Sequence, residues 1–175
     1  MNSIKIRTAT ANDTASILDI YRYYVINTAV TFECSVPSLD EFQARIGKIL
    51  SQYPYLVALR DGNIVGYAYA RAFVGREAYA HSVELTIYLA PDERGHGTGR
   101  KLYTVLEKAL SSMGIINLYA CIGDPIIEDE YLTHNSENFH THLGFTKVGT
   151  FHKCGRKFDR WYNMIWMEKI IGQRT

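Results

Sequence analysis

The sequence predicts a single mixed α/β (α+β) domain, in which a mostly antiparallel central sheet is flanked by about four helices. The apolar periodicity changes along the chain in the order strand, two helices, three strands, helix, strand, helix, two strands. This order differs from the regular alternation of a parallel sheet. Asp61-Gly62, between two apolar runs, is a strong signal for an antiparallel hairpin. A chain of 175 residues, of which 47% are hydrophobic and 21% charged, is enough for one core, so we expect one domain over 1–175.

The first elements are a strand and two capped helices. Residues 4–9 alternate like a short strand. Thr10 and Asp13 then form a capping box, and Ser38 with Glu41 forms another after a loop over 28–37. Each box precedes apolar residues at helical spacing, which are Ile17, Ile20, Tyr21 and Tyr24 in the first helix and Leu39, Phe42, Ile46, Ile49 and Leu50 in the second.

The middle of the chain predicts three strands and a helix. Residues 55–59 and 64–73 flank the hairpin signal, and residues 81–90 form a third strand that ends at Pro91. A helix is expected over 98–113, where one face carries Leu102, Val105, Leu106, Ala109, Leu110 and Met113.

The last part of the chain predicts a strand over 115–122 and a short helix over 135–143 that is closed by Gly144. Two further strands are expected near 145–152 and 158–169.

Charge and cysteine usage narrow the class of protein. The formal net charge of +1 argues against a broad nucleic-acid-binding surface. No apolar run approaches the ~20 residues of a membrane span, so no membrane association is expected. Cys34, Cys121 and Cys154 lie far apart and indicate reduced thiols. These features predict a soluble cytoplasmic domain.

The stretch ERGHGTGRK, residues 93–101, lies between a predicted strand and a predicted helix. N–H groups at a helix start lack internal partners, and bare glycines let a phosphate approach them closely. Arg100 occupies the position where both the Walker motif and the dinucleotide fingerprint require glycine. The spacing is therefore compatible with an anion site of another kind or with a plain glycine-rich turn.

A resemblance bears on this choice. Arg94-x-x-Gly97-x-Gly99, after a strand and opening a helix, resembles the signature of the GNAT superfamily of acyl-CoA-dependent N-acetyltransferases. The segments 27–33, 78–103, 139–145 and 155–167 together resemble the phosphinothricin acetyltransferase family. The resemblance implies a GNAT fold, acetyl-CoA as co-substrate, no metal and a homodimer.

The resemblance also implies cofactor contacts. The amides of the glycine turn would bind the pyrophosphate, with contributions from Arg94, Gly95, His96, Gly97, Thr98, Gly99 and Arg100. The pantetheine arm would run along the predicted strand, on backbone groups of Ile87, Tyr88 and Leu89. Asn135 is a further candidate for the cofactor arm.

Glu84 and His140 are the catalytic candidates. Glu84 is a carboxylate inside a strongly β-forming run, where it is either a general base or a solvated or salt-bridged side chain. The resemblance places the family's proposed base there, and it matches His140 to an active-site histidine. Zinc binding by His140, His142, His152 and Cys154 is not favoured, because helix positions two apart point about 200° apart.

The acceptor contacts are predicted from chemistry and from the resemblance. Arg71 and Arg76 are either carboxylate clamps or solvated side chains, and Tyr79 lies beside them. Phe32 matches the family's substrate loop. The expected function is acetyl transfer to the amine of a small amino-acid-like molecule, of the phosphinothricin or methionine sulfoximine type. The alternatives are a catalytically silent acyl-CoA-binding module and a protein N-terminal acetyltransferase.

Overall fold

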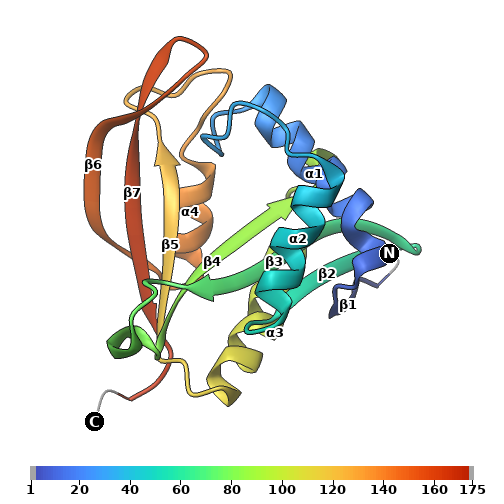
Figure 1. Ribbon diagram of the computed structural model, residues 1–175. Coiled ribbons are helices and arrows are strands. Elements are labelled where there is room, and N and C mark those ends of the chain that lie inside the picture. Colours follow the sequence, from blue (N-terminus) through green and yellow to red (C-terminus); the bar gives the residue numbers. More distant parts are fainter. Residues whose placement is uncertain (1–2, 174–175) are drawn as a thin grey trace.

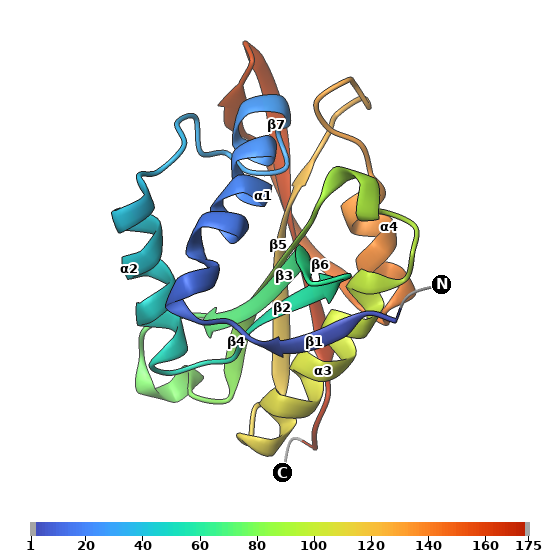
Figure 2. The same cartoon turned by 90° about the vertical axis from the view of Figure 1, so that its right-hand side faces the viewer.

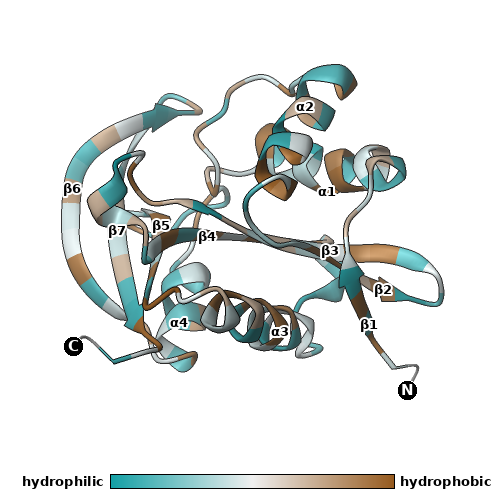
Figure 3. Ribbon diagram, turned by 60° about the horizontal axis from the view of Figure 1, so that its bottom comes forward, coloured by the Kyte–Doolittle hydropathy of each residue, from teal (hydrophilic) through white to brown (hydrophobic). Residues whose placement is uncertain are grey.

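The computed structural model describes residues 3–173 and has three layers, with a seven-stranded sheet between two pairs of helices (Figures 1 and 3). The strands lie in the order β1-β2-β3-β4-β5-β7-β6. Within the described residues, β4 and β5 form the one parallel pair. The strand bounds are β1 Lys5–Thr8, β2 Tyr55–Arg60, β3 Asn63–Ala72, β4 Ser82–Leu89, β5 Asn117–Asp124, β6 Thr146–Lys157 and β7 Arg160–Ile170. The predicted fold class is confirmed.

The helices cover opposite faces of the sheet. The helices α1 (Thr14–Asn27) and α2 (Leu39–Leu50) lie on one face, and α3 (Thr98–Ser112) and α4 (Asn135–His142) lie on the other (Figure 2). Short 3-10 turns precede α1, β4 and α3, namely η1 Ala11–Asp13, η2 Glu77–Tyr79 and η3 Pro91–Glu93. No helix within residues 3–173 combines the length and the apolar character that crossing a bilayer requires.

The local signals at the start of the chain are confirmed. Thr10 and Asp13 form a reciprocal capping box, and Arg7 donates two hydrogen bonds to Asp13, of 2.7 and 2.8 Å. The Arg7 bonds lower the pKa of Asp13 to about 2. Asp61 and Gly62 both have positive φ, of 51° and 84°, as a tight hairpin requires.

Two expectations about element details are wrong. Val105 and Met113, expected on the buried face of α3, are 41% and 48% exposed. The buried stripe is centred instead on Leu106 and includes Tyr103, which lies on that face one turn earlier. The strand β6 also runs further than expected, to Lys157.

The two faces of the sheet bury different side chains. The α3/α4 face is mainly aliphatic, whereas the α1/α2 face carries a cluster of tyrosines, composed of Tyr21, Tyr24, Tyr55, Tyr67, Tyr69 and Tyr88. Alternation along β4 explains this difference, because successive side chains point to opposite faces. Glu84, Thr86 and Tyr88 therefore face α1 and α2.

The sheet opens in its middle. Parallel pairing between β4 and β5 begins at Ser82–Asn117 and ends at Leu85–Ala120. The strands continue to Leu89 and Asp124 but diverge (Figure 1). We call the space between these diverging ends the wedge, and it positions the candidate site.

Candidate active site

The wedge exposes backbone groups of β4 at the edge away from β3. The bonds Ala90 N–H to Val65 C=O (2.9 Å) and Phe73 N–H to Ser82 C=O (3.4 Å) bracket the β3–β4 ladder. Because bonding alternates along an antiparallel ladder, Ile87 and Leu89 turn their backbone groups toward the wedge, whereas Tyr88 turns its groups to β3. Tyr24 Oη donates to the Leu89 carbonyl at 2.6 Å. Of the three expected backbone contacts, Ile87 and Leu89 thus have backbone groups directed to the wedge, whereas those of Tyr88 are directed to β3 instead.

A cavity of about 770 Å³ passes through the wedge from one face of the sheet to the other. On the α1/α2 side it is lined by tyrosines, Phe32 and Phe42, and on the α3/α4 side by Tyr103, Ser136 and His140. Burial raises the pKa values of Tyr55, Tyr67 and Tyr88 well above 10, so these phenols are neutral. The α1/α2 side is therefore rich in neutral aromatic side chains. We call it the aromatic chamber.

Glu84 provides a carboxylate in this chamber. It is 8% exposed, and Arg71, directly opposite on β3, donates from Nη2 to its Oε1 at 2.7 Å. No hydrogen bond among residues 3–173 engages Oε2. Glu84 is thus a buried, ion-paired group with one oxygen toward the cavity, and the solvated alternative does not hold.

His140 is buried, lines the cavity and bonds a partner that sequence reasoning missed. Its Nδ1 lies 2.7 Å from the Ser136 carbonyl, which can only accept, so Nδ1 carries the proton. Its Nε2 then accepts from the Tyr103 hydroxyl at 3.0 Å. Burial lowers the pKa of His140 to about 4 and raises that of Tyr103. Tyr103 and a neutral His140 act as one hydrogen-bonded pair.

The buried His140 predicts that the folded chain loses stability as the pH is lowered. Because its folded pKa of about 4 lies below its usual 6.5, the unfolded chain binds more protons between these values. The stabilisation is present above the unfolded pKa and is lost as the pH falls toward about 4. We expect this group to remove about 2 kcal/mol of unfolding free energy between about pH 7 and about pH 5.

Urea unfolding at the two pH values measures this loss. His140→Gln should have a smaller pH dependence, and His142→Gln, an exposed position on the same helix, should retain that of the wild type. An unchanged pH dependence in His140→Gln would show that other groups cause the loss.

The glycine turn between η3 and α3 has the conformation of an anion site. Gly95 and Gly97 have φ values of 82° and 77°, and a Cβ on either would contact nothing within 4 Å. Gly97 is the N-cap of α3 and offers no side-chain cap, so the first N–H groups of the helix remain available. Gly99 is needed for another reason, because its Cβ would lie 3.0 Å from the Phe139 ring.

The side chains around the turn divide into two groups. Arg94, His96 and Arg100 are exposed beside it, and Arg94 donates to Tyr24 Oη at 3.3 Å. The buried Thr98 hydroxyl donates instead to Glu93, whose carboxylate is bonded by Arg60. The Arg60 bond lowers the pKa of Glu93. Thr98 can therefore contribute its N–H to an anion, whereas its hydroxyl braces the turn.

The α1–α2 loop lines the α1/α2 side of the cavity. Phe32 packs against the bare backbone of Gly155 and Gly123, and a Cβ on Gly155 would overlap its ring. Lys157 Nζ donates to the Thr31 carbonyl at 2.9 Å, which ties the loop to β6. Arg45 also lines the cavity and bonds Glu33 and Glu41 at 2.6 Å each, an arrangement that the sequence did not suggest.

Eleven expected site residues lie outside the cavity lining, and eight of them are Leu89 and the glycine turn from Arg94 to Arg100. The other three are Arg76, Tyr79 and Asn135. Arg76 and Tyr79 are exposed at η2, where Tyr79 packs edge-on against Phe73 with ring centroids 6.0 Å apart. Asn135 is exposed at the start of α4, and its neighbour Ser136 lines the cavity instead.

Comparisons with known proteins agree with this geometry. A family described as Acetyltransferase (GNAT) domain matches residues 6–166. The chain is 31% identical to a phosphinothricin N-acetyltransferase of Streptomyces coelicolor, covering 96% of each chain. It is 30% identical to an L-methionine sulfoximine/L-methionine sulfone acetyltransferase of Salmonella typhimurium, covering 97% of this chain and 96% of that one. It is also similar to the crystal structure of a phosphinothricin acetyltransferase from Sinorhizobium meliloti in complex with AcCoA. That similarity has a TM-score of 0.88 and 36% identity, covering 97% of this chain and 89% of that one.

Proposed function

This chain belongs to the GNAT acetyltransferase family, and on that premise we propose that it transfers acetyl from acetyl-CoA to the amine of a small amino-acid-like acceptor. The acceptor is of the phosphinothricin or methionine sulfoximine type, as the names of the relatives suggest. The observation that carries the proposal is the cavity through the wedge, with Glu84 on one side and free backbone of β4 beside it.

The wedge accounts for how two substrates would meet. An extended pantetheine arm would pair with the backbone of Ile87 and Leu89, like an added strand. Its thioester would then end near Glu84, three positions earlier on the same strand than Ile87. The acceptor would occupy the aromatic chamber on the α1/α2 side, so that its amine reaches the thioester from the opposite face of the sheet.

The transfer itself needs a proton acceptor and no metal. The neutral amine attacks the thioester carbon, the C–S bond breaks, and coenzyme A leaves as a thiolate that takes up a proton. Most amino-acid amines carry a proton at neutral pH, so a base must remove it before or during attack. Oε2 of Glu84 is oriented for this task, because Arg71 fixes the other oxygen.

Tyr103 and His140 form a second proton-handling pair in the proposal. Tyr103 lines the cavity, and the hydrogen of its hydroxyl is directed to His140 Nε2. His140 thus acts through Tyr103, as a positioning residue that sets the direction of the hydroxyl. We assign Tyr103 to the thioester side of the cavity, where its hydroxyl would donate to the departing sulfur or the carbonyl oxygen once it turns its hydrogen away from His140 Nε2.

The glycine turn would hold the pyrophosphate of the cofactor. Its N–H groups from Gly95 to Arg100 and the dipole of α3 favour a negative charge. Arg94, His96 and Arg100 surround the turn and add positive charge or donors. For Asn135, which lies outside the cavity lining, a cofactor contact remains a prediction from the resemblance.

Acceptor recognition is assigned to Arg71 and Phe32. Arg71 lines the chamber and has a 55% exposed side chain, so it can bind an acceptor carboxylate while keeping its bond to Glu84. Phe32 forms a wall of the chamber. The roles of Arg76 and Tyr79 remain predictions from the sequence.

A homodimer in the cytoplasm is part of the same proposal. The strand β6 is at the edge of the sheet, and Val148, Phe151 and Trp161 on β6 and β7 are 51%, 54% and 52% exposed. Long edge strands with apolar side chains are commonly covered by a partner. The free thiols of Cys34, Cys121 and Cys154 are compatible with a reducing compartment.

An assay of thiol release from acetyl-CoA tests the function. We expect turnover with phosphinothricin, methionine sulfoximine or a related amino acid, and little turnover with peptides that carry a free N-terminus. Tight binding of acetyl-CoA without turnover across the amine panel would support a silent binding module. Turnover confined to peptides would support a protein N-terminal acetyltransferase.

A further inference from the structure

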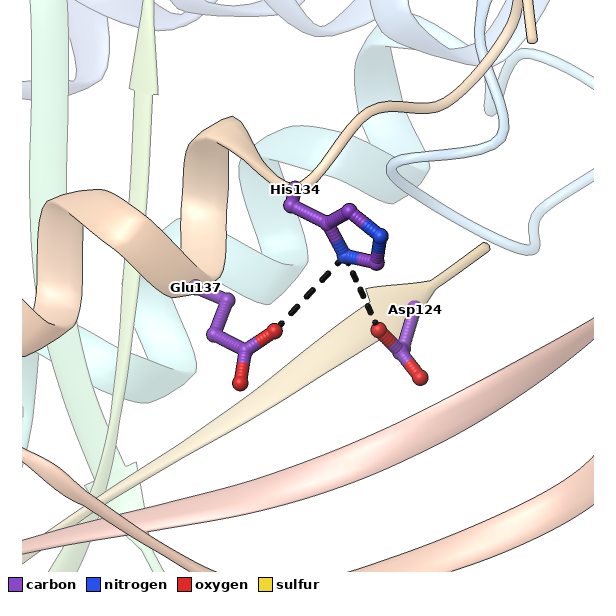
Figure 4. Close-up of side chains that lie close together, drawn as sticks. All are labelled: Asp124, His134 and Glu137. Atoms are coloured by element: carbon purple, nitrogen blue, oxygen red, sulfur yellow. Dashed lines mark ion pairs between the residues drawn. The ribbon is translucent and has the colours of Figure 1, made fainter. Parts of the chain in front are cut away.

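Asp124, His134 and Glu137 form a second cluster of ionisable side chains, outside the acyl-transfer cavity. Asp124 ends β5, His134 immediately precedes α4, and Glu137 lies in the first turn of α4 (Figure 4). One possible ligand atom from each residue lies within 4.8 Å of the others. The three side chains therefore converge from two elements that border the wedge.

The two separations from His134 fit an ion between the side chains. His134 Nδ1 lies 3.3 Å from Asp124 Oδ1 and 3.6 Å from Glu137 Oε2. Protein ligands bind Zn²⁺ at about 2.0–2.2 Å, so two ligands at corners of a tetrahedron stand about 3.3–3.6 Å apart. A direct N–H···O bond would be near 2.9 Å. No hydrogen bond in residues 3–173 joins His134 Nδ1 to either carboxylate.

Each carboxylate is oriented by an outer partner. Lys147 Nζ lies 2.6 Å from Glu137 Oε1, and Asn163 Nδ2 donates to Asp124 Oδ2 at 3.3 Å. Asn163 is itself fixed, because its Oδ1 accepts from the Lys153 N–H at 2.9 Å. Each carboxylate thus directs its other oxygen toward His134. This is how outer hydrogen bonds orient the ligands of metal centres.

Burial and charge favour a cation at the same point. Asp124 is 9% exposed, so its carboxylate is held away from bulk water. Two carboxylates and the ammonium of Lys147 leave one net negative charge before the imidazole of His134 is counted. A divalent cation would compensate that charge in a partly buried place.

We propose that Asp124, His134 and Glu137 bind a divalent transition-metal cation, and that the ligand set and spacing suit Zn²⁺ best. The ion would join the end of β5 to the start of α4 and fix the 124–134 connection between them. Ser136 and His140, on the cavity side of α4, would be held in place as a result. The ion has a structural role, and the inference does not depend on the proposed function.

Titration of the purified full chain with Co²⁺, a spectroscopic substitute for Zn²⁺, tests the proposal. We expect saturable binding of one ion per chain, visible absorption of nitrogen and oxygen ligation, and no thiolate charge-transfer band. Zn²⁺ should displace the Co²⁺ and raise the Tm. His134→Gln should weaken binding at least about tenfold, because even outer partners of a metal site are worth that much.

The matched control is His142→Gln, an exposed histidine on the same helix, which should bind like the wild type. Asp124→Asn provides a second test with an almost unchanged shape, and circular dichroism checks that each variant folds. The proposal would be overturned if His134→Gln and Asp124→Asn both bound the ion as tightly as the wild type. A thiolate band from the exposed cysteines, or no saturable binding, would also overturn it.

Discussion

Glu84→Gln is expected to lower kcat/KM by about 10²- to 10⁴-fold at about pH 7, the range of general-base assistance. Glutamine keeps the shape of the side chain and keeps an oxygen that can accept a hydrogen bond from Arg71. Arg71 therefore does not lose its hydrogen-bond partner. It removes the basic oxygen that faces the cavity. Acetyl-CoA affinity should change little, and activity should partly recover at high pH, where the free amine is plentiful. Steady-state kinetics over a pH series measures these effects.

Glu77→Gln is the matched control for this variant. Glu77 is an exposed carboxylate in η2, at the turn that joins β3 to β4, and it lies outside the cavity lining. Its replacement should leave kcat/KM at the wild-type value. Near wild-type activity of Glu84→Gln at about pH 7 would remove Glu84 as the base. Tyr103→Phe would then test whether the Tyr103–His140 pair accepts the proton.

Gly97→Ala is expected to raise the KM for acetyl-CoA by about 10- to 100-fold, because a methyl group would block one or two charge-assisted hydrogen bonds of about 1.5–3 kcal/mol. The methyl group would meet no protein atom within 4 Å, so it would project into open space beside the turn, where we propose that the phosphate binds. The φ of 77° also makes alanine costly there, by roughly 1–2 kcal/mol of stability. Initial rates at varied acetyl-CoA measure the KM, and thermal unfolding measures the stability.

Gly62→Ala separates these two effects. Gly62 has a φ of 84° and open space around its Cβ, but it lies in the β2–β3 hairpin turn. The Gly62→Ala variant should therefore lose about as much stability as Gly97→Ala, while its KM for acetyl-CoA stays unchanged. If both variants had the same KM as the wild type, the glycine turn would not hold the pyrophosphate.

Local patterns in the sequence were enough for most of the fold. The capping box at Thr10 and Asp13, the Asp61-Gly62 turn and the alternation of β4 depend on neighbours within a few residues, and each is confirmed. The burial of Val105 was predicted wrongly for a related reason. Periodicity defines a helical face only to within about one residue, and the packing partners decide where its centre falls.

The sequence by itself determined the family, the strand–turn–helix at the glycine turn and the placement of Glu84 on a strand. The tertiary structure decided which side chains Glu84 and His140 bond. The ion pair of Glu84 with Arg71 depends on the β3–β4 register, and the bond from Tyr103 to His140 joins residues 37 positions apart. The Asp124–His134–Glu137 cluster also forms only when β5 and α4 meet. Contacts between elements depend on how whole elements pack. Short-range periodicity carries no information about which residues far apart in the sequence come together.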